Sequence, residues 1–223
     1  MNSIIKIEDL KKDYNSVQKK VKVLKGINLD IKEGEFVSIM GPSGSGKSTL
    51  LYLIGGLEVP TSGSIFIENN DISHMSDKRQ SLMRLTNIGF VFQFYNLVEH
   101  MNVEDNILLP VLINGGNKKD FASKLNQILK KVGLFDKKEA YPRELSGGEQ
   151  QRVSIARALI NSPKIILADE PIGNLDSKTG KEIMDLFKDI NKTMGTSIVQ
   201  VTHSLESAKY GTRVVNVKDG ILA

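Results

Sequence analysis

The chain has 223 residues, which is enough for one sizeable hydrophobic core or for a core with a smaller lobe attached. Its 40% hydrophobic and 25% charged residues are ordinary for a folded globular protein, so the composition argues against disorder. The absence of cysteine excludes a disulfide framework and a thiolate metal site. No apolar run reaches the roughly 18 to 20 residues of a membrane span, and no signal-peptide core is recognisable, so we expect a cytoplasmic protein.

The formal net charge is +4, and a basic chain can bind nucleic acid or an anionic membrane. The lysines are scattered, however, and no aromatic residues interleave with them as a surface for single-stranded nucleic acid requires. A solvated surface is the favoured interpretation, and we expect no nucleic-acid partner.

Alternating apolar and polar residues begin the chain and predict half-exposed strands. The three stretches with this pattern are Ile5–Glu8, Val21–Leu24 and Ile27–Ile31. After a turn at Glu33–Gly34, the apolar run Phe36–Met40 predicts a buried strand. A glycine-rich loop follows at once, and Thr49–Leu57 can form a helix, so this region has the order strand, loop, helix.

The rest of the chain alternates between strand and helix patterns. Further strands are predicted at Ser64–Glu68, Ile88–Phe92, Ile165–Ala168, Ser197–Val201 and Val214–Val217. Helical periodicity dominates between about residues 102 and 158, where Phe121–Val132 places its apolar residues on one face, and returns in Lys178–Met194. The pattern predicts an α/β core with a helical insertion and an N-terminal antiparallel β layer.

The loop after the buried strand matches the phosphate-binding pattern G-x-x-x-x-G-K-[ST] in full. Its glycines allow a tight turn whose N–H groups, with the following helix N-terminus, surround phosphate oxygens. Lys47 supplies a positive charge to the β and γ phosphates, and Ser48 supplies a hydroxyl to Mg²⁺. We therefore predict MgATP as the ligand. The predicted binding residues are Gly41, Ser43, Gly44, Ser45, Gly46, Lys47, Ser48 and Thr49.

A second pattern is the apolar strand ending in Asp169 and Glu170. Carboxylates at the carboxyl end of such a strand lie at the edge where open α/β sheets bind ligands. Asp169 can hold Mg²⁺ through water, and Glu170 can polarise an attacking water. An acidic pair at a helix N-terminus is the alternative interpretation, and the upstream phosphate loop makes it less favoured.

A third pattern is Leu145–Arg152, in which Ser-Gly-Gly-Glu precedes a helical run. Ser146, Gly147, Gly148 and Glu149 provide free N–H groups, a hydroxyl and a positive helix end, which together form a second anion site. The residues alone leave open the simpler interpretation of a capped helix.

In this order the three patterns resemble the ATPase subunit of an ABC transporter, and the resemblance covers nearly the whole chain. It implies the ABC ATPase fold: a P-loop NTPase core with a mainly parallel sheet, in a single domain over residues 1–223 with a helical subdomain at about 94–160. It also implies ATP hydrolysis, with Glu170, His203 and Lys47 as catalytic residues.

The resemblance assigns four further positions. Gln93 matches the Q-loop, which touches Mg²⁺ and water and faces the membrane partner, so Ser48, Gln93 and Asp169 form the implied metal set. Asp176, in Asn174–Asp176, matches the D-loop that crosses a dimer interface. His203 matches the histidine that contacts the γ-phosphate, and Tyr14 matches the aromatic residue that stacks on adenine. A purely structural role remains the alternative for each lone residue, and Tyr14 could pack in the β layer.

The implied assembly is a head-to-tail homodimer around two MgATP. Residues Ser146 to Glu149 of one copy would cover the γ-phosphate held by Lys47 of the other. The implied partners are this second copy and an integral-membrane permease, which places the subunit peripherally on the inner face of the cell membrane.

The segments Asp169–Gly180 and Gly89–Gln93 are similar to the branch of lipoprotein-release, macrolide-export, cell-division and antimicrobial-peptide-resistance ATPases. That branch usually has Thr where Ile172 stands, so the hydrogen bonding before the D-loop is in question. We expect an export or mechanotransmission system for an antimicrobial peptide, a lipoprotein or a macrolide-like substrate. In a Gram-positive cell, release to an outer membrane is impossible and peptide resistance or export becomes the expectation.

The alternative is an ABC-type ATPase that acts on nucleic acid or regulates cell division. The nucleic-acid class needs long coiled coils or inserted zinc modules. The chain between Thr49 and Leu145 has neither heptads nor cysteines.

Overall fold

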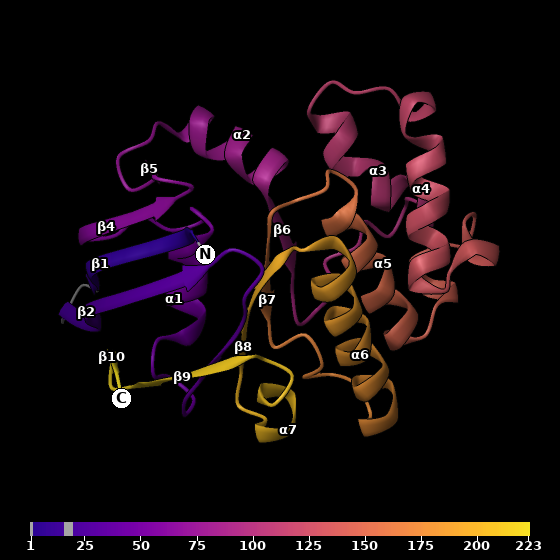
Figure 1. The fold of residues 1–223 in the computed structure, drawn as a ribbon. Helices are drawn as coiled ribbons and strands as arrows, with labels where there is room; N and C mark the ends of the chain where they lie inside the picture. The colour runs from indigo at the N-terminus through magenta and orange to yellow at the C-terminus, as the bar shows by residue number, and fades with distance from the viewer. Residues whose placement is uncertain (1, 16–19) are drawn as a thin grey trace.

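The computed structural model describes residues 2–15 and 20–223, and it contains two sheets with helices around them (Figure 1). The first sheet is antiparallel with the order β2-β1-β4-β5. Its strands are β1 (Ser3–Asn15), β2 (Lys20–Lys32), β4 (Ser62–Ile67) and β5 (Asn70–Asp71). The predicted antiparallel layer is therefore present.

Strand β2 joins two stretches that the sequence pattern separates at Gly26. Leu10 pairs with Ile27 and Lys11 pairs with Lys25, so Gly26 is an extra residue in the ladder. Its φ of +104° is one that glycine adopts readily. The break in alternation is thus a β-bulge inside one long strand.

The second sheet has the order β10-β9-β3-β8-β7-β6, and its pairs are parallel except for β9 with β10. Its strands are β3 (Phe36–Met40), β6 (Ile88–Val91), β7 (Ile165–Asp169), β8 (Ser197–Thr202), β9 (Arg213–Lys218) and β10 (Ile221–Leu222). The mainly parallel sheet is confirmed. Strands β3, β7 and β8 run in register, with Met40 opposite Thr202 and Asp169 opposite Val201, so their carboxyl ends share one edge.

Seven α-helices belong to the described chain: α1 (Lys47–Ile54), α2 (Asp77–Asn87), α3 (Val103–Ile113), α4 (Lys118–Val132), α5 (Gly147–Leu159), α6 (Ser177–Met194) and α7 (Leu205–Ala208). Helices α2 and α7 were not predicted, because α2 buries only Gln80 and α7 has four residues, so neither has an apolar stripe. No helix within the described ranges is long and apolar enough to cross a membrane.

Two hydrophobic cores lie on opposite faces of the parallel sheet. Successive residues of β7 alternate between them: Ile165 and Leu167 join the core with α1 and the antiparallel sheet, whereas Ile166 and Ala168 join the core with α3 to α6. Figure 1 shows the antiparallel sheet with α1 on one side of β6 to β8 and the helices α3 to α6 on the other. Helices α3, α4 and α5 lie in the chain between the paired strands β6 and β7, and the helical subdomain at about 94–160 stays a prediction.

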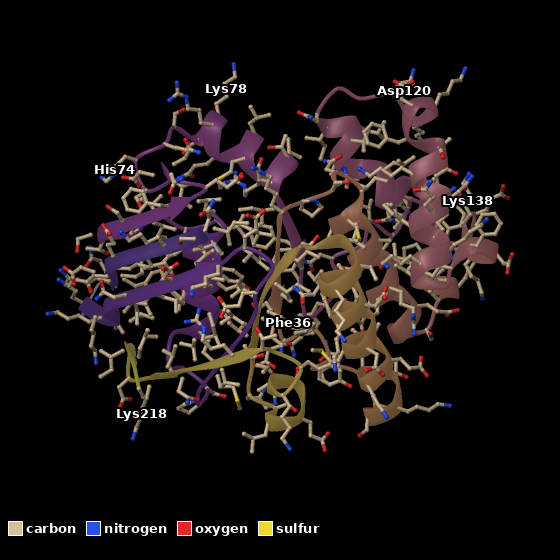
Figure 2. All side chains as sticks on the ribbon, viewed as in Figure 1. Phe36, His74, Lys78, Asp120, Lys138 and Lys218 are labelled. Atoms are coloured by element: carbon tan, nitrogen blue, oxygen red, sulfur yellow. The ribbon has the colours of Figure 1, made fainter. Side chains whose placement is uncertain are left out.

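Apolar side chains fill the interior of the molecule, and charged side chains lie at its surface. Phe36 lies in the interior with 2% exposure, whereas Lys78, Asp120, Lys138 and Lys218 extend from the periphery (Figure 2). The labelled charged residues lie on different elements around the molecule, in keeping with a solvated charged surface.

Helix α5 rests closely on β6 at Gly89. A Cβ added to Gly89 would lie 2.6 Å from the Ala158 carbonyl oxygen, which belongs to the helix backbone. Gly180 differs, because its nearest neighbour would be the Ile172 side chain at 3.5 Å, an ordinary contact.

We expect Gly89→Ala to lower the free energy of unfolding by about 1–3 kcal/mol, because α5 must move away from the sheet. Gly180→Ala, within α6, should leave it unchanged or raise it by about 0.5–1 kcal/mol, because alanine favours a helix. Urea unfolding of both variants checks this pair. Equal effects of the two changes would contradict the packing argument.

Candidate functional site

The glycine-rich loop connects β3 to α1 and is pressed against neighbouring backbone. A Cβ on Gly41 would lie 2.0 Å from the Val217 carbonyl oxygen of β9. Gly46 caps α1 with a φ of +100°, and a Cβ there would lie 2.8 Å from a methyl carbon of Leu24. These two positions therefore require glycine, and with Gly46 as its N-cap α1 begins two residues earlier than predicted.

The loop forms a polar concavity suited to an anion. A space of about 280 Å³ is lined by Val23, Gly44, Gly46, Lys47, Ser48 and Thr49. Lys47 is 8% exposed and its Nζ donates to the Pro42 carbonyl oxygen at 2.9 Å, so its charge is held over the loop. The buried Ser45 Oγ has no hydrogen-bond partner within the described chain. These donors, together with the positive N-terminus of α1, fit a phosphate chain.

Asp169, at the end of β7, is hydrogen-bonded to α1 through both carboxylate oxygens. Ser48 Oγ donates to Oδ1 at 2.9 Å, and the Tyr52 hydroxyl donates to Oδ2 at 2.5 Å. Ser48 and Asp169 thus place a hydroxyl and a carboxylate together, which are the oxygen ligands that Mg²⁺ prefers in nucleotide sites. The donor set therefore fits the predicted Mg²⁺.

Tyr52 was missed by the sequence analysis. It follows Ser48 by four residues, so both side chains lie on one face of α1, and that spacing was the available signal. Burial, with the hydrogen bond to Asp169 as a further cause, raises the pKa of Tyr52 to about 12. The phenol therefore stays protonated, and a donor, at neutral pH.

Glu170 and His203 meet at the same sheet edge. His203 Nδ1 lies 2.9 Å from Glu170 Oε1, although the two residues follow different strands. Glu170 has a φ of +45°, a conformation that costs of order 1–3 kcal/mol for a residue with a side chain. Its N–H donates to the Val201 carbonyl oxygen at 3.1 Å, which holds this backbone in place. The structure thus brings two of the three predicted catalytic groups into direct contact.

Gln93 contacts the D-loop segment rather than the metal residues. Its Nε2 donates to Asn174 Oδ1 at 3.3 Å, and Asn174 Nδ2 donates to the Gln93 carbonyl oxygen at 3.0 Å. No hydrogen bond joins it to Ser48 or Asp169 in the described chain. One of these bonds joins the two side-chain amides and the other joins Asn174 to the main chain of Gln93. Together they link the chain after β6 with the chain after β7.

The Ser-Gly-Gly-Glu segment forms a capping box on α5. Ser146 Oγ accepts from the Glu149 N–H at 3.3 Å, and Glu149 Oε2 accepts from the Ser146 N–H at 2.8 Å. The latter bond is the main cause that lowers the pKa of Glu149. Gly147 and Gly148 form the first helical turn, where a Cβ on Gly148 would lie 2.4 Å from a Thr179 methyl group. The capped helix is therefore present, and whether its end also binds an anion stays a prediction.

Ile172, which stands where Thr is usual, packs against the core with α3 to α6. The turn before the D-loop is formed by backbone bonds: Gly173 N–H donates to Glu170 at 2.9 Å, and Leu175 N–H donates to Ile172 at 3.1 Å. Asp176 then caps α6 by accepting from the N–H groups of Lys178 and Thr179, each at 3.0 Å. The missing hydroxyl leaves this turn intact.

Tyr14 lies near the end of β1, opposite Val21 of β2. Its side chain is 39% exposed, so it does not pack in the core of the β layer. Lys12 Nζ lies 4.7 Å from the ring centroid, a cation–π contact. Val23, two residues after Val21 on β2, lines the space at the phosphate loop. The Tyr14 ring therefore belongs to the pair of strands beside that loop.

Arg157, on α5, is a further residue that the sequence analysis did not single out. Its guanidinium donates to the carbonyl oxygens of Tyr95 and Asn96 at 2.7 and 2.6 Å. Both acceptor residues have positive φ, +59° and +50°. Burial lowers the pKa of Arg157. The arginine thus holds a strained loop next to Gln93.

Comparisons with known proteins agree with this geometry. Residues 24–173 match the family model described as "ABC transporter". The chain is 48% identical to the lipoprotein-releasing system ATP-binding protein LolD of Aquifex aeolicus, over 99% of this chain and 96% of that protein. It is also 48% identical to the uncharacterized ABC transporter ATP-binding protein YknY of Bacillus subtilis, over 97% and 94%.

The chain is also similar to a solved structure. It is the dimeric post-hydrolysis state of the ATP-binding cassette MJ0796 of Methanocaldococcus jannaschii, bound to ADP and Pi. It superimposes with a TM-score of 0.89 at 44% identity, covering 98% of this chain and 96% of that one. The similarity confirms the predicted fold.

We expect Lys47→Ala to weaken ATP binding by about tenfold or more, because a buried charged donor to phosphate is lost. Calorimetric titration with ATP measures this, and Lys188→Ala, an exposed lysine on α6, is the control that should bind normally. Equal ATP affinity of the two variants would show that the loop does not hold the phosphates.

Proposed function

The chain belongs to the ABC transporter family. From that premise we propose that each ATP is bound between two copies of the chain, by the N-terminus of α1 in one copy and the N-terminus of α5 in the other. The chain is an ATP-binding subunit of an ABC transporter, and its activity is ATP hydrolysis. The arrangement of the two copies, and the transport process that ATP hydrolysis drives, are parts of the proposal.

The observation that carries the proposal is that α1 and α5, whose N-termini are the two predicted anion sites, lie on opposite faces of the sheet. Helix α1 packs in one core and α5 in the other, so the phosphate loop and Ser146 of one chain do not surround a common ligand. Two chains stacked head to tail would bring each Ser146 over the phosphates bound by the other chain's Lys47. The dimeric state of MJ0796 supports the association of two copies.

The proposed chemistry uses groups that already meet at the sheet edge. Loop N–H groups and Lys47 would hold the phosphates, and Ser48 and Asp169 would hold Mg²⁺, which would neutralise charge between the β and γ phosphates. Glu170, oriented by its contact with His203, would polarise the water that attacks the γ-phosphate. While Nδ1 of His203 faces Glu170, its other ring nitrogen, Nε2, would contact the γ-phosphate.

We propose that the permease docks beside the Gln93 loop. A groove of about 310 Å³ lies there, and its walls include apolar side chains. Among them are Phe90, Phe92, Leu109, Pro110 and Ile113. Ile113 is 64% exposed and the neighbouring Phe94 is 72% exposed, and exposed apolar residues of this kind mark contact surfaces. This docking would place the subunit on the inner face of the membrane.

The proposed system is of the export or mechanotransmission type. The similarity to a lipoprotein-releasing ATP-binding protein supports it. The substrate class that follows is an antimicrobial peptide, a lipoprotein or a macrolide-like compound.

We expect Glu170→Gln to bind ATP and to remain a stable dimer, because the nucleotide is held but not hydrolysed. Light scattering after size exclusion, with and without ATP, measures the state. A Glu170→Gln variant that stays monomeric in saturating ATP would contradict the head-to-tail arrangement.

Two substitutions at Ser146 sharpen this test in the Glu170→Gln background. Asp and Asn both cap helices well, so both should preserve α5. Ser146→Asp adds a negative charge that repels the neighbour's phosphates, and it should abolish the dimer without weakening ATP binding by the monomer. Ser146→Asn should still dimerise. Dimers of equal stability from both would place the ATP contact elsewhere.

The permease proposal is tested in cells that lack the gene. We expect them to become more sensitive to at least one cell-wall-active peptide, and wild type but not Glu170→Gln should restore resistance. Ile113→Lys should fail to restore it while the purified variant keeps its basal ATPase activity. Met194→Lys is the matched control, because Met194 is also an exposed apolar residue that ends a helix. Unchanged sensitivity to every peptide would count against the peptide substrate.

A further inference from the structure

The carboxylate of Asp169 is immobilised by two donors from one helix. Ser48 binds one oxygen and Tyr52 binds the other, and the two residues are one helical turn apart on α1. Asp169 is 8% exposed, so water does not readily replace either donor. Both hydrogen bonds therefore persist as parts of the folded site.

The second donor decides how the carboxylate is oriented. The terminal torsion of an aspartate is broad, so one hydrogen bond leaves the carboxylate plane free to turn. A second bond, donated by Tyr52 to the other oxygen, fixes the plane, with Oδ1 directed at Ser48. A buried carboxylate oxygen left unpaired would instead be driven to find another donor, which would turn Oδ1 away.

We propose that Tyr52 is a positioning residue for the metal ligand Asp169: its hydroxyl fixes the carboxylate so that Ser48 and Asp169 are directed together at Mg²⁺. This inference rests on the proposed function, because it assigns Mg²⁺ to this pair. Tyr52 does not touch the phosphates in this assignment. Its loss should therefore weaken the contribution of Mg²⁺ to nucleotide binding and leave metal-free ATP binding intact.

The test compares Tyr52→Phe with the parent in the Glu170→Gln background, so that ATP is not consumed. Calorimetric titrations with ATP are made once with Mg²⁺ and once with EDTA. In Mg²⁺ the affinity of Tyr52→Phe should fall about tenfold, as expected for a lost hydrogen bond to a charged group. In EDTA the two affinities should agree within about twofold, because the phosphate loop is unchanged.

Tyr210→Phe is the matched control. The Tyr210 phenol also lies near a carboxylate, that of Asp185 on α6, and its removal should change neither titration. Tyr52→Met, which also lacks the hydroxyl, should behave as Tyr52→Phe does and serves if the latter folds poorly.

Two results would overturn the inference. One is an equal gain in ATP affinity from Mg²⁺ in Tyr52→Phe and in the parent. The other is a parallel loss of affinity with Mg²⁺ and with EDTA, which indicates a general disturbance of α1. A parent protein that binds no ATP at all would instead refute the proposed function, so the two failures are distinguishable.

Discussion

The hydrogen bonds between Asp169 and α1 hold two distant parts of the chain together at the proposed nucleotide site. Ser48 and Asp169 are 121 positions apart, and they meet because α1 packs against β7 in the core on one face of the sheet. The phosphate loop is the backbone that joins β3 to this same helix. Its shape, the direction of the Lys47 side chain and the position of the Ser48 hydroxyl therefore depend on how firmly α1 is tied to the end of β7.

A buried polar network performs a similar task for His203. Gln200, in the middle of β8, donates to Ser38 Oγ of β3 at 2.7 Å and to the Ser207 carbonyl oxygen of α7 at 2.8 Å. Ser38 in turn donates to the Ala208 carbonyl oxygen at 3.0 Å. All of these side chains are buried, so each bond is costly to break. The network attaches α7 to β3 and β8, and it thereby also holds the short loop that carries His203.

The sequence predicted those parts of the site that depend on local pattern. The loop between β3 and α1, the strand ending in Asp169 and the cap of α5 are each specified within about ten residues, and each is present. Helix α2 has no local signal because its surface is polar on nearly all sides. The hydrogen-bond contacts of Tyr52, Asn174 and Arg157 were missed for a different reason. Their partners lie 117, 81 and 61 to 62 positions away, and only the packing of α1, the D-loop segment and α5 brings them into contact.

Helix α5 rigidly connects the segment at Ser146 with the apolar groove. Ser146 caps one end, and Arg157 near the other end grips the strained loop at Tyr95 and Asn96, which borders the apolar groove. Eleven residues of helix separate them by about 16 Å, and a helix of this length does not compress. A tilt imposed at Ser146 is therefore reproduced at the groove without any intervening loop to absorb it. The displacement passed on to a docked protein would depend on the length of α5 and on how it packs against the sheet.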